Sequence, residues 1–362
     1  MAKAARVISM WSAEPSLNPA GLRKRMYPVS GPLQAYLDHE GRGVKLPIAY
    51  ADLLRHDGVM PRRGPRGEDT LWQSVLFRPV DREELEHRLV ETYQRLVADG
   101  RRIDHLRIGE VDLCPYGNSQ PFRVKVINLL NDNHDYFYVK RTDANRVYGL
   151  ELEHLLSPYR ISYLVEGSSL VEEHIIGVPG DAFIADPARY GGELNRVRLC
   201  KEFVKFNERC FVRLLGDMRA YNFVVDAIHD VDQVQYRMRA IDLDQQCHEG
   251  RLRNYLPQFY KENLPYVRLA QEAIGAETAA QYRSEERALI RRRARRSQNR
   301  LRELIAAMKQ DAIAPQENVA QLGQELAAHH ADAAFKGMPT MGHLLEGHLA
   351  KCLAELGWGS DE

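Results

Sequence analysis

The sequence has few cysteines, no excess of either charge and no long apolar run, and each absence excludes a class of protein. Its 5 cysteines are widely spaced and contain no CxxC pair, which argues against a disulfide framework and against a structural zinc site. Lysine plus arginine and aspartate plus glutamate number 50 each, so the chain as a whole is not a polyanion-binding protein. No stretch approaches the roughly 20 apolar residues of a membrane span, and residues 1–17 lack the apolar run of a signal peptide. We therefore expect a cytoplasmic protein without a membrane partner.

What is present is typical of a folded chain, because 44% of the residues are hydrophobic and 28% are charged. A length of 362 residues is long for one compact unit, so two lobes or domains are expected. Residues 1–80 are rich in proline, glycine and arginine, which predicts an irregular segment with short helices at 31–39 and 50–55. A helix is predicted at 80–99, where Asp81 as N-cap and Glu84 have the spacing of a capping box.

The pattern changes near residue 103, where β-branched and aromatic residues become frequent. A polar turn at 131–135 predicts a β-hairpin, and a helix from Thr142 or Asp143 to about Leu156 should follow it. Strands packed around this single helix would form a small antiparallel lobe. The predicted strands are 103–111, 122–130, 136–141, 161–166 and 169–176.

From Asn195 onward the pattern is mostly helical and includes a helix at 284–308. Two strands, Phe223–Val225 and Met238–Leu243, interrupt it. The fold class is therefore expected to be α+β. The expected domains are an N-terminal extension (1–102), a β lobe (103–176), a helical lobe (177–313) and a C-terminal helical extension (314–362).

Oxygen-bearing side chains flank the two interrupting strands. Asp217 precedes Asn222 by five residues, and Asp242 lies in the second strand pattern. A hairpin would bring Asn222 and Asp242 side by side. Mg²⁺ prefers a few carboxylate or amide oxygens together with phosphate oxygens, and phosphoryl transfer needs an aspartate near the acceptor hydroxyl. Asp244 is either a second metal ligand or the cap of the strand end.

Lys140 ends an earlier strand and shares one face with Tyr138. A strand lysine held by a helix glutamate can bind the α- and β-phosphates of ATP. Glu151 on the following helix is our preferred partner, and a slightly later glutamate stays an alternative. The plainer interpretation of Lys140 is a solvated lysine on an edge strand.

Taken in order, these residues resemble the protein-kinase-like superfamily, closest to its aminoglycoside- and choline-kinase-like branch, over about residues 103–250. The resemblance implies a two-lobed fold that binds ATP and Mg²⁺ between its lobes. It also implies transfer of the γ-phosphate to a hydroxyl of a small molecule or a protein. The residues that match the family are the strand lysine Lys140, its glutamate Glu151, the hinge 171–183 with Glu173 and His174 at the adenine edge, the catalytic Asp217, the loop asparagine Asn222 and the metal aspartate Asp242.

The sequence departs from the family at several positions. Leu215 stands where a histidine is usual, and the turn at 112–121 offers Gly117 and Ser119 as phosphate contacts in place of a GxGxxG loop. Arg219 either contacts the transferred phosphate or pairs with a carboxylate. A catalytically inactive module that binds a nucleotide or a partner is therefore the main alternative, and transfer of AMP is another.

A basic run, Arg291–Arg296, supports a third alternative. Residues 281–310 contain ten lysines and arginines against three glutamates, so a nucleic-acid-associated regulator could use the helix 287–302. Leu289 and Ile290 give this helix an apolar side, which favours an ordinary solvated helix. His329, His330, His343 and His348 match no ligand pattern such as HExxH, and we predict that they lie on the surface or in helix packing.

Overall fold

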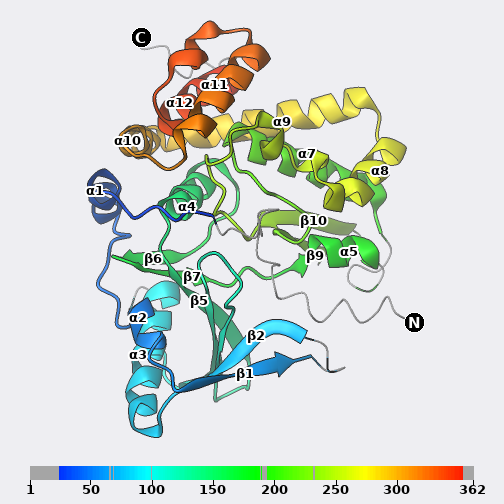
Figure 1. Ribbon diagram of the computed structural model, residues 1–362. Coiled ribbons are helices and arrows are strands. Elements are labelled where there is room, and N and C mark those ends of the chain that lie inside the picture. Colours follow the sequence, from blue (N-terminus) through cyan, green and yellow to red (C-terminus); the bar gives the residue numbers. More distant parts are fainter. Residues whose placement is uncertain are drawn as a thin grey trace. The chain divides into compact units, whose positions relative to one another are not determined.

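The computed structural model describes residues 24–64, 67, 69–98, 100–187, 189, 194–230 and 233–353. Residues 1–17, for which the sequence predicts no signal peptide, lie outside this part. The chain forms two compact units, of which unit 1 comprises residues 1–143 and 161–174, and unit 2 comprises residues 144–160 and 175–362 (Figure 1). Each unit combines strands and helices, so the expected α+β class is confirmed. Among the described helices, none has the length and apolar content needed to cross a membrane.

The sheet of unit 1 is antiparallel throughout, with the strand order β1-β2-β3-β4-β5-β7-β6 in the described chain. The hairpin predicted around 131–135 is confirmed as β4 and β5, which pair from Phe122↔Val139 to Ile127↔His134. The strands are β1 (Gly58–Arg63), β2 (Asp69–Leu76), β3 (Leu106–Leu113), β4 (Phe122–Asn128), β5 (His134–Arg141), β6 (Tyr163–Glu166) and β7 (Ser169–Glu173).

The prediction that residues 1–80 are irregular is wrong for β1 and β2. β1 is an edge strand that contains Pro61, and its register with β2 shifts between Pro61 and Arg63. Proline and a register shift are tolerated at a sheet edge but give a poor strand signal in the sequence. Pairing between the two strands, rather than local propensity, determines this part of the fold.

Three helices accompany the sheet of unit 1: α1 (Gly31–His39), α2 (Tyr50–Leu53) and α3 (Pro79–Ala98). α3 packs against β3 and β7, and α2 packs against β5 and β7. The predicted helix at 80–99 is thus confirmed, but it begins at Pro79. Asp81 therefore lies inside the first turn, where it pairs with Arg78, and it is not the N-cap that the sequence predicts.

Unit 2 is mainly helical. The helix predicted to end near Leu156 is confirmed as α4 (Ala144–Leu156), but α4 packs against α9 and α10 and so belongs to unit 2 rather than to a β lobe. A small sheet of order β10-β9-β8 lies in the same unit. The remaining elements are β8 (Val178–Pro179), α5 (Gly180–Ala185), α7 (Arg196–Val212), β9 (Phe223–Asp230), β10 (Gln233–Ala240), α8 (Leu264–Ala273), α9 (Ala276–Arg296), α10 (Gln298–Lys309), α11 (Gln316–His330) and α12 (Met341–Leu353).

α7 is central to unit 2 because it packs against α8, α9 and β10. Its Phe203 stacks on Tyr266 at 5.1 Å between ring centroids, and its Phe206 meets Phe223 at 4.9 Å. The single helix predicted at 284–308 is wrong, since Ser297 has non-helical torsion angles and separates α9 from α10. A serine hydroxyl competes for backbone hydrogen bonds and gives little warning of a helix break in the sequence.

The basic run lies on α9 as an amphipathic surface. Ile290 and Ala294 are buried, whereas Arg292, Arg295 and Arg296 are exposed. Arg287 of the same helix pairs with Glu208 of α7. The arrangement agrees with the plainer interpretation of a solvated helix.

Candidate functional site

The β9–β10 hairpin brings Asn222 and Asp242 together. The strands pair in register from Phe223↔Ala240 to Asp230↔Gln233, so Asn222 precedes one strand and Asp242 follows the other. The amides of Ile241 and Asp242 lie 3.0 and 3.4 Å from the Asn222 carbonyl oxygen. The predicted juxtaposition is therefore confirmed.

Asp217 lies in the loop before this hairpin and is held in a defined orientation. Its φ of +56° is a left-handed conformation, which aspartate tolerates better than most side chains. Its amide donates to the Asn254 carbonyl (3.3 Å) and to the Tyr260 hydroxyl (3.1 Å). The amide nitrogen of the Asn222 side chain donates to the Asp217 carbonyl at 2.7 Å and lies 3.3 Å from Asp217 Oδ2. Asp217 and Asn222 thus form one rigid group.

The side-chain oxygen of Asn222 is the most informative atom of the site. Asn222 is only 1% exposed, and its Oδ1 has no hydrogen-bond partner among the residues that the structure describes. A buried amide oxygen without a donor destabilises the fold by about 1–3 kcal/mol. The same atom is a ready ligand for a hard cation. Its surroundings are oxygen-rich, so the residues present fit Mg²⁺.

Arg146 of α4 contacts the two acidic residues that follow β10, and no motif in the sequence pointed to it. Its guanidinium lies 3.2 Å from Asp242 Oδ1 and 2.8 Å from Asp244 Oδ1, and it also donates to the Ile241 carbonyl. Gly149 lets α4 come this close, because a Cβ there would lie 3.0 Å from the Cβ of Leu243. The Asp242 carboxylate also accepts the amide of Asp244 at 3.1 Å. We call Asp217, Asn222, Asp242 and Asp244 the oxygen cluster.

Burial controls the electrostatics of the oxygen cluster. Burial, with a contribution from Asp244, raises the pKa of Asp242 to about 7, while Arg146 opposes the rise. Burial also raises the pKa of Asp217, against the opposing effect of Arg219. Desolvation disfavours a carboxylate that lacks enough positive charge nearby. A cation bound at the cluster would therefore stabilise the ionised forms.

For Arg219 the sequence left two alternatives, a contact with the transferred phosphate or a pair with a carboxylate. Its Nε donates to Asp217 Oδ1 at 2.6 Å, and its guanidinium lies 3.3 Å from Glu262. The ring of Tyr260 lies under the guanidinium at 5.1 Å. The structure thus shows Arg219 in a carboxylate pair.

Lys140 and Glu151 each have an ion-pair partner within their own unit. Lys140 Nζ lies 2.6 Å from Glu172 Oε2, and both residues are buried. The register pairs Tyr138 with Glu172 and Lys140 with Leu170, which puts Lys140 and Glu172 on one face of the sheet. Glu151 of unit 2 pairs with Arg300 at 2.5 Å. The prediction that Glu151 positions Lys140 therefore gives way to Glu172, which only the register of β5 and β7 reveals.

The expected adenine contacts, Glu173 and His174, are engaged in the sheet of unit 1. Their amides donate to the carbonyls of Ser162 (3.0 Å) and Tyr136 (3.3 Å). The His174 ring lies 3.1 Å from the Tyr138 hydroxyl, and burial lowers its pKa to about 4. These two amides are therefore used within the sheet of unit 1, and the adenine contact expected of this backbone stays a prediction.

Gly117 and Ser119 form part of one tight turn between β3 and β4. The amide of Gln120 donates to the Gly117 carbonyl at 3.1 Å, and the amide of Arg141 donates to the Ser119 carbonyl at 3.2 Å. The turn is thus fixed beside the end of β5, where Lys140 lies. The phosphate contacts expected of Gly117 and Ser119 stay a prediction.

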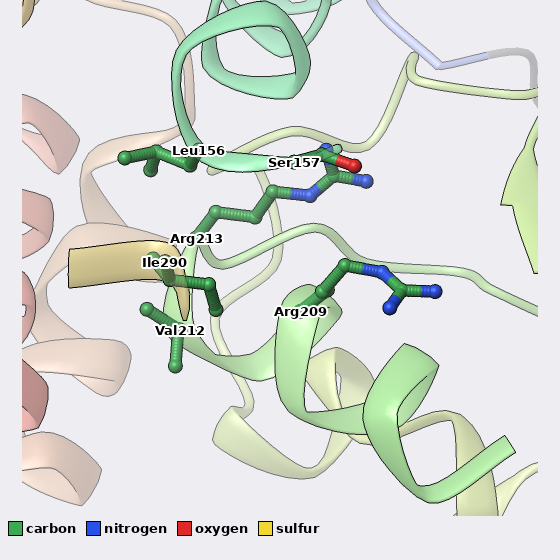
Figure 2. A pocket seen from close by; sticks show the side chains of 6 residues that line it. All are labelled: Leu156, Ser157, Arg209, Val212, Arg213 and Ile290. Atoms are coloured by element: carbon green, nitrogen blue, oxygen red, sulfur yellow. The ribbon is translucent and has the colours of Figure 1, made fainter. Parts of the chain in front are cut away.

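Two cavities of unit 2 lie away from the oxygen cluster. Figure 2 shows the smaller one, where Arg209 and Arg213 of α7 meet Leu156, Ser157 and Ile290. It has essentially no free volume, and its arginines pair with carboxylates, Arg209 with Glu202 and Glu286 and Arg213 with Glu153. The larger cavity, about 830 Å³ between α7, α8 and α9, has none of the candidate residues in its lining. Neither cavity is the predicted site.

Comparison of the sequence with protein-family models and with curated proteins gives no match.

Proposed function

We propose that this protein is an ATP- and Mg²⁺-dependent phosphotransferase of two-lobed, kinase-like architecture that moves the γ-phosphate of ATP to a hydroxyl of a small molecule or a protein. The observation that carries the proposal is the buried Oδ1 of Asn222, which receives no hydrogen bond within the described part of the chain and lies in an acidic cluster. Kinase-like sites use an asparagine and an aspartate in this way for their metal ions.

Asp217 is the proposed catalytic carboxylate. Its orientation is fixed by Asn222, and its raised pKa makes it a better proton acceptor than a solvated aspartate. It would orient the acceptor hydroxyl and take its proton. Arg219 lowers the pKa of Asp217 against the effect of burial and holds one oxygen of its carboxylate, and it is thus a positioning residue.

Asn222 and Asp242, with Asp244 beside them, would hold Mg²⁺, which when bound neutralises the charge of the phosphates. Lys140 of unit 1 is the proposed phosphate ligand. Its ion pair with Glu172 fixes the direction of the ammonium group in the sheet. A lysine held in this way loses little freedom when it binds a phosphate oxygen.

One observation favours a second candidate, an inactive nucleotide-binding module. Arg146 occupies oxygens of both Asp242 and Asp244, and Arg219 occupies an oxygen of Asp217. An arginine on a metal-binding carboxylate competes with the metal ion. Such a protein would bind ATP weakly or without Mg²⁺ and would not turn it over.

The first experiment is a nucleotide thermal shift with and without Mg²⁺ on the wild type and on Asp242→Ala. We expect Mg²⁺ to increase the ATP-dependent shift of the wild type and to have no such effect on the variant. Asp226→Asn on β9 of the same hairpin is the control and should behave as the wild type. Equal Mg²⁺·ATP binding by wild type and Asp242→Ala would refute the metal assignment.

The second experiment separates the activities. ATP labelled in its γ- or its α-phosphate is incubated with the protein and a panel of hydroxyl compounds, and label transfer and ADP release are followed. Transfer of the γ-label supports the phosphotransferase, whereas transfer of the α-label indicates AMP transfer. Binding of Mg²⁺·ATP without transfer of either label supports the inactive module.

A further inference from the structure

A second polar cluster lies in the C-terminal helices of unit 2, formed by His330, His348 and Cys352. His330 ends α11, and His348 and Cys352 lie one turn apart on one face of α12. One candidate ligand atom from each residue lies within 4.8 Å of the other two. We call these three residues the nitrogen–sulfur cluster.

The orientation of His348 is set by a backbone carbonyl. Its Nε2 lies 3.0 Å from the carbonyl oxygen of Phe211 on α7, and a carbonyl can only accept, so Nε2 carries the proton. The lone pair of the neutral ring is then on Nδ1, which lies 2.9 Å from His330 Nε2 and 3.8 Å from Cys352 Sγ, while the same sulfur lies 3.5 Å from Nε2. Metal-ligating histidines are characteristically fixed by such a bond from their second ring nitrogen.

The distances suit a tetrahedral ion. Zn–N bonds of about 2.0–2.1 Å and Zn–S bonds of about 2.3 Å space two nitrogens by about 3.3 Å and a nitrogen from a sulfur by about 3.6 Å. His330 Nε2 lies 2.9 Å from His348 Nδ1, and Cys352 Sγ lies 3.8 Å from the same Nδ1. Shifts of a few tenths of an ångström would complete the spacing around Nδ1. The sulfur, which also lies 3.5 Å from Nε2, has to move towards the Nδ1 side of the ring, and its distance from His330 is within 4.8 Å.

The surroundings limit access to one side. His348 is fully buried and Cys352 is 7% exposed, whereas His330 is half-buried and reaches solvent. The rings of Phe211 and Phe335 lie 4.8 Å from His348 and 5.3 Å from His330, respectively. An apolar wall with one open edge suits an ion that keeps a single exchangeable position.

The cluster is not arranged for nucleophilic chemistry. Burial raises the pKa of the Cys352 thiol to about 12, so the thiol stays protonated at neutral pH unless a metal ion replaces its proton.

We propose that His330, His348 and Cys352 form a three-ligand site for one Zn²⁺-class divalent ion, with the fourth position open to water beside His330. Two imidazole nitrogens and a thiolate select a borderline-soft metal against Mg²⁺ and Ca²⁺. The ion joins α11 to α12. This site is independent of the oxygen cluster and of the phosphotransferase activity proposed for it.

The test is a Co²⁺ titration of the full chain after treatment with EDTA. We expect one equivalent of Co²⁺ to give the ultraviolet sulfur-to-cobalt charge-transfer band and the visible bands of a tetrahedral site, and Zn²⁺ to abolish both. Cys352→Ser should lose the charge-transfer band, and His330→Gln should bind Co²⁺ at least about tenfold more weakly. Circular dichroism confirms that each variant is folded, and His330→Gln changes only a half-buried side chain.

Cys200→Ser, which alters another buried cysteine, should keep the full spectrum. A wild type without the charge-transfer band would show that the residues form a hydrogen-bonded histidine pair only. A band that persists in Cys352→Ser would assign the sulfur to another cysteine. Either result overturns the proposal.

Discussion

The oxygen cluster and the nitrogen–sulfur cluster accommodate burial in different ways, although both lie in unit 2. Asp217, Asp242 and Asp244 are kept beside the guanidinium groups of Arg146 and Arg219. In the nitrogen–sulfur cluster the groups are neutral, because burial lowers the histidine pKa values and raises that of the thiol. A metal ion must therefore displace an arginine at the first cluster and a proton at the second.

The largest expected effect is on catalysis at the oxygen cluster. Asp217→Asn removes the proton acceptor but keeps the shape of the side chain, so γ-phosphate transfer should fall by about 10²–10⁴-fold. Mg²⁺·ATP affinity should change little, because Asp217 is not a proposed metal ligand. Steady-state transfer and thermal shift measure the two effects, with Asp226→Asn as the control. Undiminished transfer would remove Asp217 from its proposed role.

The proposal that a cation displaces Arg146 from Asp242 and Asp244 can be tested by removing the guanidinium group. Arg146→Met leaves Asp242 and Asp244 without their buried partner, and the free energy of unfolding should fall by about 2–4 kcal/mol. Asp242, at 21% exposed, can take up a proton or a cation, which keeps the loss below that of a fully enclosed pair. Millimolar Mg²⁺ should restore part of the stability. Urea unfolding with and without Mg²⁺ measures the difference.

Arg300→Met is the matched control for Arg146→Met, since Arg300 also pairs with a buried carboxylate of unit 2, that of Glu151. This variant should lose stability without recovering it in Mg²⁺. If Mg²⁺ rescues both variants equally, the oxygen cluster is not the site of the cation.

The effect of burying an uncharged histidine, as in the nitrogen–sulfur cluster, can be tested in unit 1 with His174. Its pKa is about 4 in the folded protein and 6.5 in the reference state, so the unfolded state binds a proton first as the pH falls. The stability contributed by the neutral ring is complete above about pH 6.5 and is lost on acidification. At pH 5 the loss should be about 1–2 kcal/mol. Urea unfolding of wild type and His174→Gln at pH 7 and pH 5 measures it, and equal losses would contradict the assignment.

The smallest expected effects are those of each cluster on the other. Because sites that share no partners act almost additively, Asp242→Ala should leave the Co²⁺ spectrum unchanged. Cys352→Ser should likewise leave the Mg²⁺-dependent nucleotide shift within about twofold of the wild type. A large cross-effect would mean that the two clusters are coupled, and the comparison would then fail.

The sequence predicted features that depend on local patterns. The polar turn near 131–135 predicted the β4–β5 hairpin, and the strand patterns Phe223–Val225 and Met238–Leu243 predicted the β9–β10 hairpin. Both hairpins join strands that are adjacent in the sequence, so local residue patterns are enough to predict them.

The features that it missed depend on register and tertiary packing. Glu172 becomes the partner of Lys140 only through the pairing of β5 with β7. Arg146 reaches Asp242 only because α4 packs within unit 2. The nitrogen–sulfur cluster combines two helices and a carbonyl of a third, and no spacing rule covers that combination.

Because Gly149 has no Cβ, α4 and the acidic segment after β10 are in direct contact and must move together. With Leu243 atoms 3.0–3.2 Å from where a Cβ would stand, nothing separates α4 from the acidic segment. A displacement of α4 must carry that segment with it or break the contact. Arg146 and Glu151 both lie on α4. A movement of α10 that pulls on Glu151 through Arg300 would therefore also move Arg146 and the carboxylates after β10, because no loop intervenes.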